Sequence, residues 1–262
     1  MKRKVRALVI TPEYLLSTRE FEVLWQTLRL GRMPYPLDVP SEGDTEQERK
    51  ALQDRTLEGL RRRGIGTGSR LDDLFRVLDD HEVSVDAVAG LGRTVRALAA
   101  SNGFQAVLAV IDGDEVGLTE IRPTALAREI VRVLPAGEAG PGSALSVRLE
   151  TLQQAVALQE AEQDDEDSED PWGAADDELD DRQALLRAGL SAQDARQMDE
   201  LASNRVAGGQ FGVTHGRHRA DVVINWFDTH QGRYLMVRSD GWLSLSPTDN
   251  ERIATRIDAV LA

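Results

Sequence analysis

The chain of 262 residues contains no cysteine. That absence excludes disulfides, thiolate metal sites and cysteine nucleophiles together, and it fits a reducing compartment. The sequence also lacks the run of ~20 apolar residues that a membrane-spanning helix needs. The basic residues 1–4 precede an apolar stretch, 5–10, which Arg6 breaks and Pro12 stops, so it is too short for a signal peptide. We therefore expect a cytosolic protein.

A basic surface is missing as well, because the formal net charge is −14. Between Glu160 and Asp181 there are thirteen Asp or Glu residues and no Lys or Arg, so this one segment carries nearly the whole excess. A nucleic-acid binder needs a basic face that releases counterions. We therefore expect no nucleic-acid partner.

The acidic segment cannot bury apolar surface, and its charges repel one another, so we predict a disordered insertion over residues 160–181. A calcium site is the alternative, but the segment lacks the alternating ligands and the central glycine of an EF-hand loop. The segment is more simply interpreted as a solvated spacer. Repelling partners or adding solubility is a less favoured role for it.

Two stretches of the chain repeat one order of elements. In the first, the apolar run 106–111 turns at Asp112-Gly113 and returns to Pro123-Thr124 and a helix. In the second, strand-like runs end at Pro247-Thr248 and a final helix. Apolar residues recur at i, i+4, i+7 and i+8 in both helices, which predicts one buried face in each. These residues are Leu126, Ile130, Val133 and Leu134 in the first helix and Ile253, Ile257, Val260 and Leu261 in the second.

Local signals mark the other elements. Helix starts are predicted where a Ser or Thr precedes an acidic residue by three positions. These pairs are Ser17 with Glu20, Thr45 with Glu48, Ser69 with Asp72 and Thr248 with Glu251, and Ser191 is predicted to cap a further helix. Runs at 5–10, 83–87 and 94–99 are predicted to be strands, and the Pro/Gly-rich stretch 135–142 is predicted to be a hinge. The sequence thus predicts an α+β fold with two related halves, 1–135 and 136–262, and a mostly antiparallel sheet flanked by helices.

Motifs that could carry chemistry are weak. The run Gly64-Ile65-Gly66-Thr67-Gly68-Ser69 looks like a phosphate cradle, but it follows a predicted helix rather than a strand and has no lysine after it. His215 and His218 flank a predicted hairpin tip, and no third metal ligand is suggested nearby. We therefore expect no catalytic residues, no cofactor and no metal site, and a protein that is not an enzyme.

Two groups of segments form one ordered set along the chain. The C-terminal ones are Gly209-Gln210-Phe211-Gly212-Val213, Phe227-Asp228-Thr229 and Gly232-Arg233-Tyr234-Leu235. The upstream ones are residues 21–25, 30–31, 37–40, 95–99, 106–114 and 122–126. Together these segments resemble the EspG family of type VII (ESX) secretion. The similarity covers nearly the whole chain except the acidic segment, and the order and spacing of the segments make it specific.

This resemblance implies a fold and a role. The fold would have quasi-twofold related halves around a central sheet. The role would be that of a cytosolic chaperone that binds secreted PE–PPE-like helical pairs, masks their apolar helical tip and keeps them soluble. The family's partner contacts, carried onto this chain, would be Gly90, Leu91, Gly92 and Arg93 in a loop and Leu185, Leu186, Leu190, Met198 and Leu201 on second-half helices. Ordinary core packing is the alternative for each of those Leu and Met residues.

Two functional alternatives stay open. A non-enzymatic adaptor or scaffold of the same fold could bind a different protein partner, and a nucleotide-binding enzyme would rest only on the glycine run at 64–69. The free protein could also form a homo-oligomer through its docking surface. The acidic insertion lies beside the predicted docking helices in the sequence, where it could shield the surface, tune partner choice or do neither.

Overall fold

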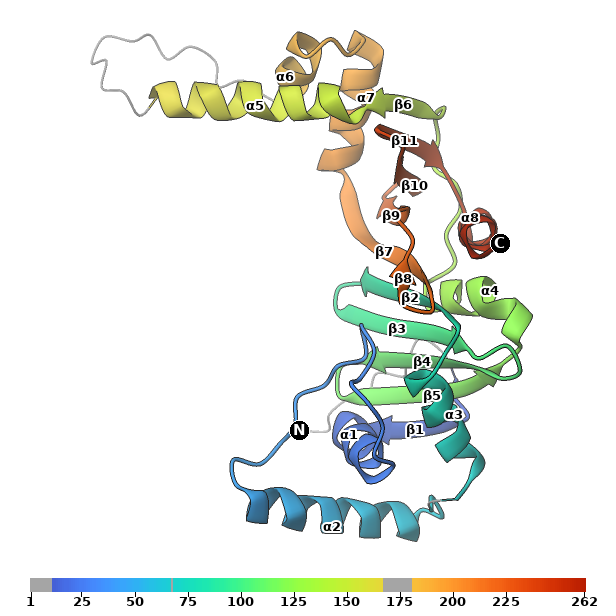
Figure 1. Ribbon diagram of the computed structural model, residues 1–262. Helices are drawn as coiled ribbons and strands as arrows, with labels where there is room; N and C mark the ends of the chain where they lie inside the picture. The colour runs from blue at the N-terminus through green and yellow to red at the C-terminus, as the bar shows by residue number, and fades with distance from the viewer. Residues whose placement is uncertain (1–10, 67, 167–180) are drawn as a thin grey trace. The chain divides into compact units, whose positions relative to one another are not determined.

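The computed structural model describes residues 11–66, 68–166 and 181–262 (Figure 1). The chain forms two compact units, and neither is continuous in sequence. Unit 1 comprises Met1–Gly137, Gly209–Val222 and Asn250–Ala262, and unit 2 comprises Glu138–Gly208 and Val223–Asp249. Because these units interleave along the chain, the division into halves at residue 135 stays a prediction.

Unit 1 contains all the described helices and strands up to Val131, together with β8 and α8 from the last part of the chain. They are β1 (Tyr14–Ser17), α1 (Thr18–Thr27), α2 (Glu46–Arg62), α3 (Arg70–Asp79), β2 (Val83–Gly90), β3 (Thr94–Ser101), β4 (Ala106–Asp112), β5 (Glu115–Ile121), the 3₁₀ turn η1 (Pro123–Ala125), α4 (Leu126–Val131), β8 (His218–Arg219) and α8 (Asn250–Leu261). Strand β7 (Arg205–His215) begins in unit 2 and ends in unit 1.

The sheet of unit 1 has the order β1-β5-β4-β3-β2-β7. Tight turns connect β2, β3, β4 and β5, and each neighbouring pair among these strands is antiparallel. The turn between β4 and β5 contains Gly113, whose φ of 64° is a conformation that glycine adopts without strain. The predicted strands at 83–87, 94–99 and 106–111 and the turn at Asp112-Gly113 are therefore confirmed.

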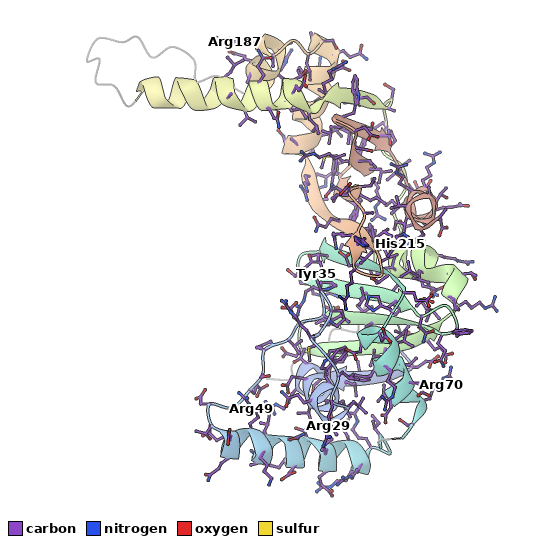
Figure 2. The ribbon with its side chains drawn as sticks, in the orientation of Figure 1. Arg29, Tyr35, Arg49, Arg70, Arg187 and His215 are labelled. Atoms are coloured by element: carbon purple, nitrogen blue, oxygen red, sulfur yellow. The ribbon has the colours of Figure 1, made fainter. Side chains whose placement is uncertain are left out.

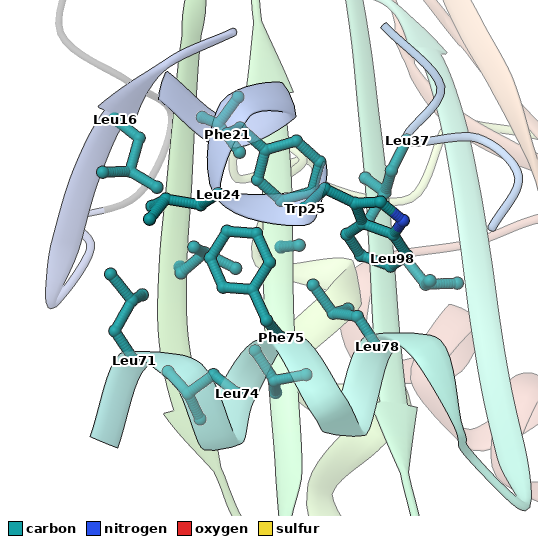
Figure 3. Packing of buried hydrophobic residues seen from close by; sticks show 14 of the residues in the cluster. Leu16, Phe21, Leu24, Trp25, Leu37, Leu71, Leu74, Phe75, Leu78 and Leu98 are labelled. Carbon is teal, nitrogen blue, oxygen red and sulfur yellow. The ribbon is translucent and has the colours of Figure 1, made fainter. Parts of the chain in front are cut away.

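Helices α1 and α3 cover one face of this sheet and form its core (Figure 3). Three aromatic rings meet there, with centroid distances of 5.8 Å for Phe21–Trp25, 5.0 Å for Phe21–Phe75 and 6.0 Å for Trp25–Phe75. The Trp25 indole donates a hydrogen bond to the Gly31 carbonyl at 2.8 Å, so its polar atom is satisfied. Helix α4 contacts β2, β3 and β4 and also α8.

Unit 2 repeats part of this topology. Its elements are β6 (Leu145–Arg148), α5 (Leu149–Glu166), α6 (Asp181–Arg187), α7 (Ala192–Ser203), β9 (Val223–Thr229), β10 (Gly232–Ser239) and β11 (Trp242–Pro247). The strand order β9-β10-β11-β6 matches β3-β4-β5-β1 of unit 1. In unit 1 the short strand β1, which precedes α1, pairs antiparallel with β5. In unit 2 the short strand β6, which precedes α5, pairs antiparallel with β11.

One hydrogen bond is also repeated. The amide of Thr18, the first residue of α1, donates to the Asp114 carbonyl at 2.9 Å, and the amide of Leu149, the first residue of α5, donates to the Gly241 carbonyl at 2.9 Å. Asp114 lies in the turn that precedes β5, and Gly241 lies in the turn that precedes β11. The predicted α+β fold with a large antiparallel sheet is confirmed.

Most predicted helix starts are confirmed. Ser17 and Thr45 form reciprocal capping boxes, and the Ser191 hydroxyl accepts a hydrogen bond from the Asp194 amide. Two predictions were wrong in detail. Ser69 precedes α3 without a side-chain capping bond, because the Asp72 carboxylate accepts from the Gly68 amide instead. Helix α8 begins only at Asn250, and the Thr248 amide donates to the Arg233 carbonyl at 3.0 Å.

Two further predictions differ from the structure or lie outside it. The predicted strand at 5–10 falls outside the described residues, while β1, only four residues long, was not predicted. The predicted disordered insertion begins at Glu160, but α5 continues to Glu166, because the Ala, Gln and Glu residues there propagate a helix well. Helix α6 begins at Asp181, and residues 167–180 are not described.

Candidate partner-binding site

An apolar groove lies between α7 and the sheet of unit 2, with a cavity volume of about 170 Å³. We call it the α7 groove. Eight residues line it: Met198, Leu201, Ala202, Arg205, Phe227, Met236, Leu243 and Leu245. A cavity of roughly 150 Å³ holds a benzene molecule, so the α7 groove has room for one large apolar side chain of a partner.

Helix α7 supplies one wall of the groove. The Ser191 cap fixes the start of the helix, and Met198 and Leu201 then fall on one face because they are three residues apart. Leu201 is buried, whereas Met198 packs against the same cluster while staying partly exposed. A flexible methionine at the edge of a groove adapts readily to different side chains.

The sheet supplies the floor. Side chains alternate along each strand, so Leu243 and Leu245 of β11 share a face, and Met236 of β10 stands opposite Leu245. Phe227 of β9 stands opposite Tyr234 of β10, and their rings stack with centroids 5.5 Å apart. The register of three neighbouring strands therefore gathers the apolar floor.

A polar cavity of about 830 Å³ runs along the same helix, and Leu201 borders both spaces. Side chains with amide or charged groups line much of it: Arg182, Gln193, Arg196, Gln197, Glu200, Asn204 and Gln231. An apolar centre beside a polar margin is the usual anatomy of a protein–protein interface.

The β2–β3 turn of unit 1 carries the other predicted contact residues. Gly92 has a φ of 69°, and the Leu91 amide donates to the Arg93 carbonyl at 2.8 Å. The Arg93 guanidinium donates to both carboxylate oxygens of Asp112, at 2.5 and 2.6 Å. The turn is thus held in one conformation, with Leu91 half-buried near its tip.

Comparison with protein families matches residues 17–259 to the EspG family. The chain belongs to the EspG family. A search of curated protein sequences found no match. Among solved structures, the type VII secretion system chaperone EspG5 of Mycobacterium tuberculosis, solved in complex with the PE25-PPE41 dimer, is similar to this chain. The TM-score is 0.67, the identity is 14%, and 95% of each chain is covered, so the likeness shows the fold.

Three of the predicted contact residues of this EspG-family chain lie at or beside the α7 groove. Met198 and Leu201 line it, and Leu190 packs against the cluster beside it. Leu185 packs instead against Ala155 and Ala184, and Leu186, 37% exposed, is not among the lining residues. Contact of these residues with a partner stays a prediction, as it does for Gly90, Leu91, Gly92 and Arg93.

Sequence reasoning missed the floor of the groove. Phe227, Met236, Leu243 and Leu245 read as ordinary strand residues. The available signal was their alternation with polar neighbours, which marks one face of a strand. That signal does not say which helix, if any, covers the face.

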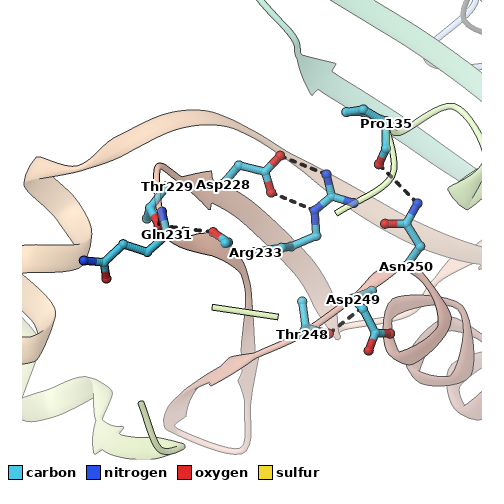
Figure 4. Close-up of polar contacts among 9 residues, drawn as sticks. Pro135, Asp228, Thr229, Gln231, Arg233, Thr248, Asp249 and Asn250 are labelled. Atoms are coloured by element: carbon cyan, nitrogen blue, oxygen red, sulfur yellow. Dashed lines mark hydrogen bonds and ion pairs between the residues drawn. The ribbon is translucent and has the colours of Figure 1, made fainter. Parts of the chain in front are cut away.

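The C-terminal EspG-like motif has a structural role (Figure 4). The Arg233 side chain, 0% exposed, donates to both oxygens of Asp228 at 2.7 and 2.8 Å and lies 4.8 Å over the Trp226 ring. The Tyr234 hydroxyl donates to the Pro141 carbonyl at 2.9 Å, and burial raises the pKa of Tyr234. A side chain on Gly140 would collide with the Tyr234 ring. These contacts fix residues 138–141, which lie within the predicted hinge, onto β10.

The remaining motifs show no assembled site. The glycine run follows helix α2, as predicted, and precedes α3, with Thr67 outside the described residues. His215, labelled in Figure 2, and His218 pair at the β7–β8 hairpin, and the His215 ring lies 3.4 Å from the Val260 carbonyl. In the described part of the chain, no group of three His, Asp or Glu side chains could hold a metal. No described helix is long and apolar enough to cross a membrane.

Proposed function

We propose that this chain is a cytosolic, non-enzymatic chaperone of type VII secretion that binds a secreted PE–PPE-like helical pair. The single observation that carries the proposal is the α7 groove, an open apolar pocket with a polar cavity along the same helix, in a member of the EspG family. The structure of EspG5, which was solved with a PE25-PPE41 dimer and shares this fold, supports the choice of partner.

The proposed mechanism is the burial of an apolar tip. An exposed apolar patch on a helical substrate promotes aggregation. When a large side chain from that tip enters the α7 groove, the free concentration of the aggregating form falls by mass action. Because the groove accepts only one such side chain, specificity would depend on the polar cavity and on a total interface of roughly 1,000 Å² or more.

The substitution Met198→Glu tests the groove. It places a carboxylate where an apolar side chain would enter, and we expect the affinity for a cognate PE–PPE-like pair to fall at least about tenfold, because burying an unpaired charge is costly. Isothermal titration calorimetry measures the dissociation constant, and co-expression measures the soluble yield of the pair. Val156→Glu is the matched control, because Val156 is an exposed apolar residue of α5 outside the groove.

The outcomes separate the alternatives. A loss with Met198→Glu but not with Val156→Glu supports docking in the α7 groove. Equal affinity for wild type and both variants would place the substrate elsewhere on the chain. No complex with any pair encoded beside the same secretion system, together with stable complexes with unrelated proteins, would favour the adaptor alternative.

A further inference from the structure

Unit 1 carries a cavity of about 560 Å³ with an unusual concentration of arginine. We call it the arginine cavity. Its lining residues are Arg70, Thr119, Glu120, Ile121, Arg122, Ala125, Arg128, Glu129 and Arg132. Four guanidinium groups and two carboxylates therefore surround one space on a chain whose overall charge is −14.

Three adjoining elements bring these arginines together. Arg122 follows β5 directly and has extended backbone angles, and Pro123 then begins η1. Arg128 and Arg132 lie four residues apart at and just after α4, so they share one side of that turn. Arg70, labelled in Figure 2, is the first residue of α3 and closes the cavity.

Two of the four arginines already hold a carboxylate. Arg70 pairs with Glu120, and Arg132 Nη1 lies 2.8 Å from Glu129 Oε2. Arg122 and Arg128 are exposed and form no ion pair with any described residue. The cavity therefore has two guanidinium groups available and an excess of two positive charges. Its own glutamates show that its geometry accommodates carboxylate–guanidinium pairs.

A second observation also points to a ligand. Thr119 lines the cavity, and its buried hydroxyl has no hydrogen-bond partner among the described residues. A buried hydroxyl without a partner is unfavourable, and an incoming acceptor would relieve that cost. Thr119 thus supplies a donor beside the two unpaired arginines.

The chemistry of the lining residues selects among anions. Guanidinium groups bind carboxylates through paired hydrogen bonds. None of the lining residues is aromatic, so the cavity offers no surface on which a nucleotide base could stack. Its volume falls in the range of sites that enclose several chemical groups rather than one small ion. We propose that the arginine cavity binds an acidic segment of a protein partner, with two carboxylates on Arg122 and Arg128.

A labelled peptide tests this assignment on the full-length chain. The probe is a fluorescein-labelled peptide of alternating Asp and Ser, and the control peptide alternates Asn and Ser. Fluorescence anisotropy at low salt should show binding of the acidic peptide only. The double substitution Arg122→Gln with Arg128→Gln should raise its dissociation constant at least about tenfold, because two charge-assisted contacts are lost.

A matched control separates a site from general charge attraction. Arg217→Gln with Arg238→Gln removes the same charge from two exposed arginines outside the cavity, and it should leave the dissociation constant nearly unchanged. Circular dichroism checks that both variants fold. Equal loss in the two double variants, or no loss in either, would overturn the proposal. Displacement of the peptide by pyrophosphate at concentrations no higher than the peptide's own dissociation constant would show a small-anion site and overturn it too.

Discussion

Four strands in each unit share one order but differ in what covers them. Strands β3-β4-β5-β1 of unit 1 lie under α1 and α3, which contribute the rings of Phe21, Trp25 and Phe75 to a closed core. Strands β9-β10-β11-β6 of unit 2 lie beside α7, which contributes Met198 and Leu201 and leaves the α7 groove open. The repeated topology therefore determines the order of the strands, but it does not determine how completely helices cover their faces.

Side-chain volume explains the difference. A close-packed interior has few voids larger than a water molecule, and unit 1 approaches that state with three large rings on one face. In unit 2 the rings of Phe227 and Tyr234 lie on the strands, and helix α7 covers them with Met198 and Leu201. Met198, Met236 and Leu190 stay only partly buried there. An incompletely covered apolar face contributes less to stability but can accept a side chain from a partner.

The largest expected effect comes from opening the closed core. Phe75→Ala removes the ring that contacts both Phe21 and Trp25, and it should lower the free energy of unfolding of unit 1 by about 3–5 kcal/mol. Urea denaturation followed by tryptophan fluorescence measures the change. A loss below about 1 kcal/mol would mean that the core collapses around the missing ring. The packed face of unit 1 would then not differ from the open face of unit 2 in the way proposed.

A comparable effect should follow in unit 2 from its buried ion pair. Asp228→Ala removes the carboxylate that holds the fully buried Arg233 side chain, and such losses cost about 3–5 kcal/mol. Thermal unfolding by calorimetry measures the loss. Asp86→Asn is the comparison in unit 1, because the side chain of its partner Arg219 is 42% exposed and can be hydrated. If both substitutions had equal effects, burial of the arginine would not be the cause.

Filling the α7 groove with a larger side chain should separate its effect on binding from its effect on stability. Leu243→Phe adds a ring at the floor of the α7 groove and is expected to change stability only slightly, raising it by at most about 1 kcal/mol. Binding of a PE–PPE-like pair should nevertheless weaken, because the space for the partner is occupied. The melting temperature and the dissociation constant are measured on the same preparation. Unchanged binding would argue against the groove as the docking site.

The smallest effect concerns pH. Burial raises the pKa of Asp86 above its ordinary value of 3.8, and the hydrogen bonds and charge of Arg219 oppose this only in part. The folded state therefore binds this proton more tightly than the unfolded chain. The stability from this group is fully present below pH 3.8 and is lost as the pH rises through the raised pKa.

Asp86→Asn removes that dependence. As the pH falls from neutrality toward 3.8, the unfolding free energy of the wild type should rise relative to that of the variant. Urea denaturation at a series of pH values measures the difference. A difference that changes in the opposite direction would show that the pair with Arg219 outweighs the burial of Asp86.

Local signals predicted much of the fold. Ser17 with Glu20 and Thr45 with Glu48 form the expected capping boxes, and the turn at Asp112-Gly113 joins β4 to β5. Each of these features depends on residues only a few positions apart. Strand β1 was missed because four residues are too few for an alternating pattern and its pairing with β5 joins residues about a hundred positions apart.

The candidate site was only partly predictable. The family resemblance pointed to the helix that carries Met198 and Leu201, and both residues line the α7 groove. The four floor residues were missed because only strand register brings them together. The burial of Arg233 was also not expected, since arginine is mostly exposed unless it is paired. The arginine cavity joins residues near 70, 120 and 130, a separation that no local pattern reveals.

By itself, the sequence determined the kind and order of the elements, the repeated arrangement and the family resemblance, because these depend on neighbouring residues and on motif spacing. Only the tertiary structure decided which sheet face is filled and which stays open. That outcome depends on the side-chain volume that a helix distant in the sequence places over equivalent strands, three aromatic rings in one unit and a methionine and a leucine in the other.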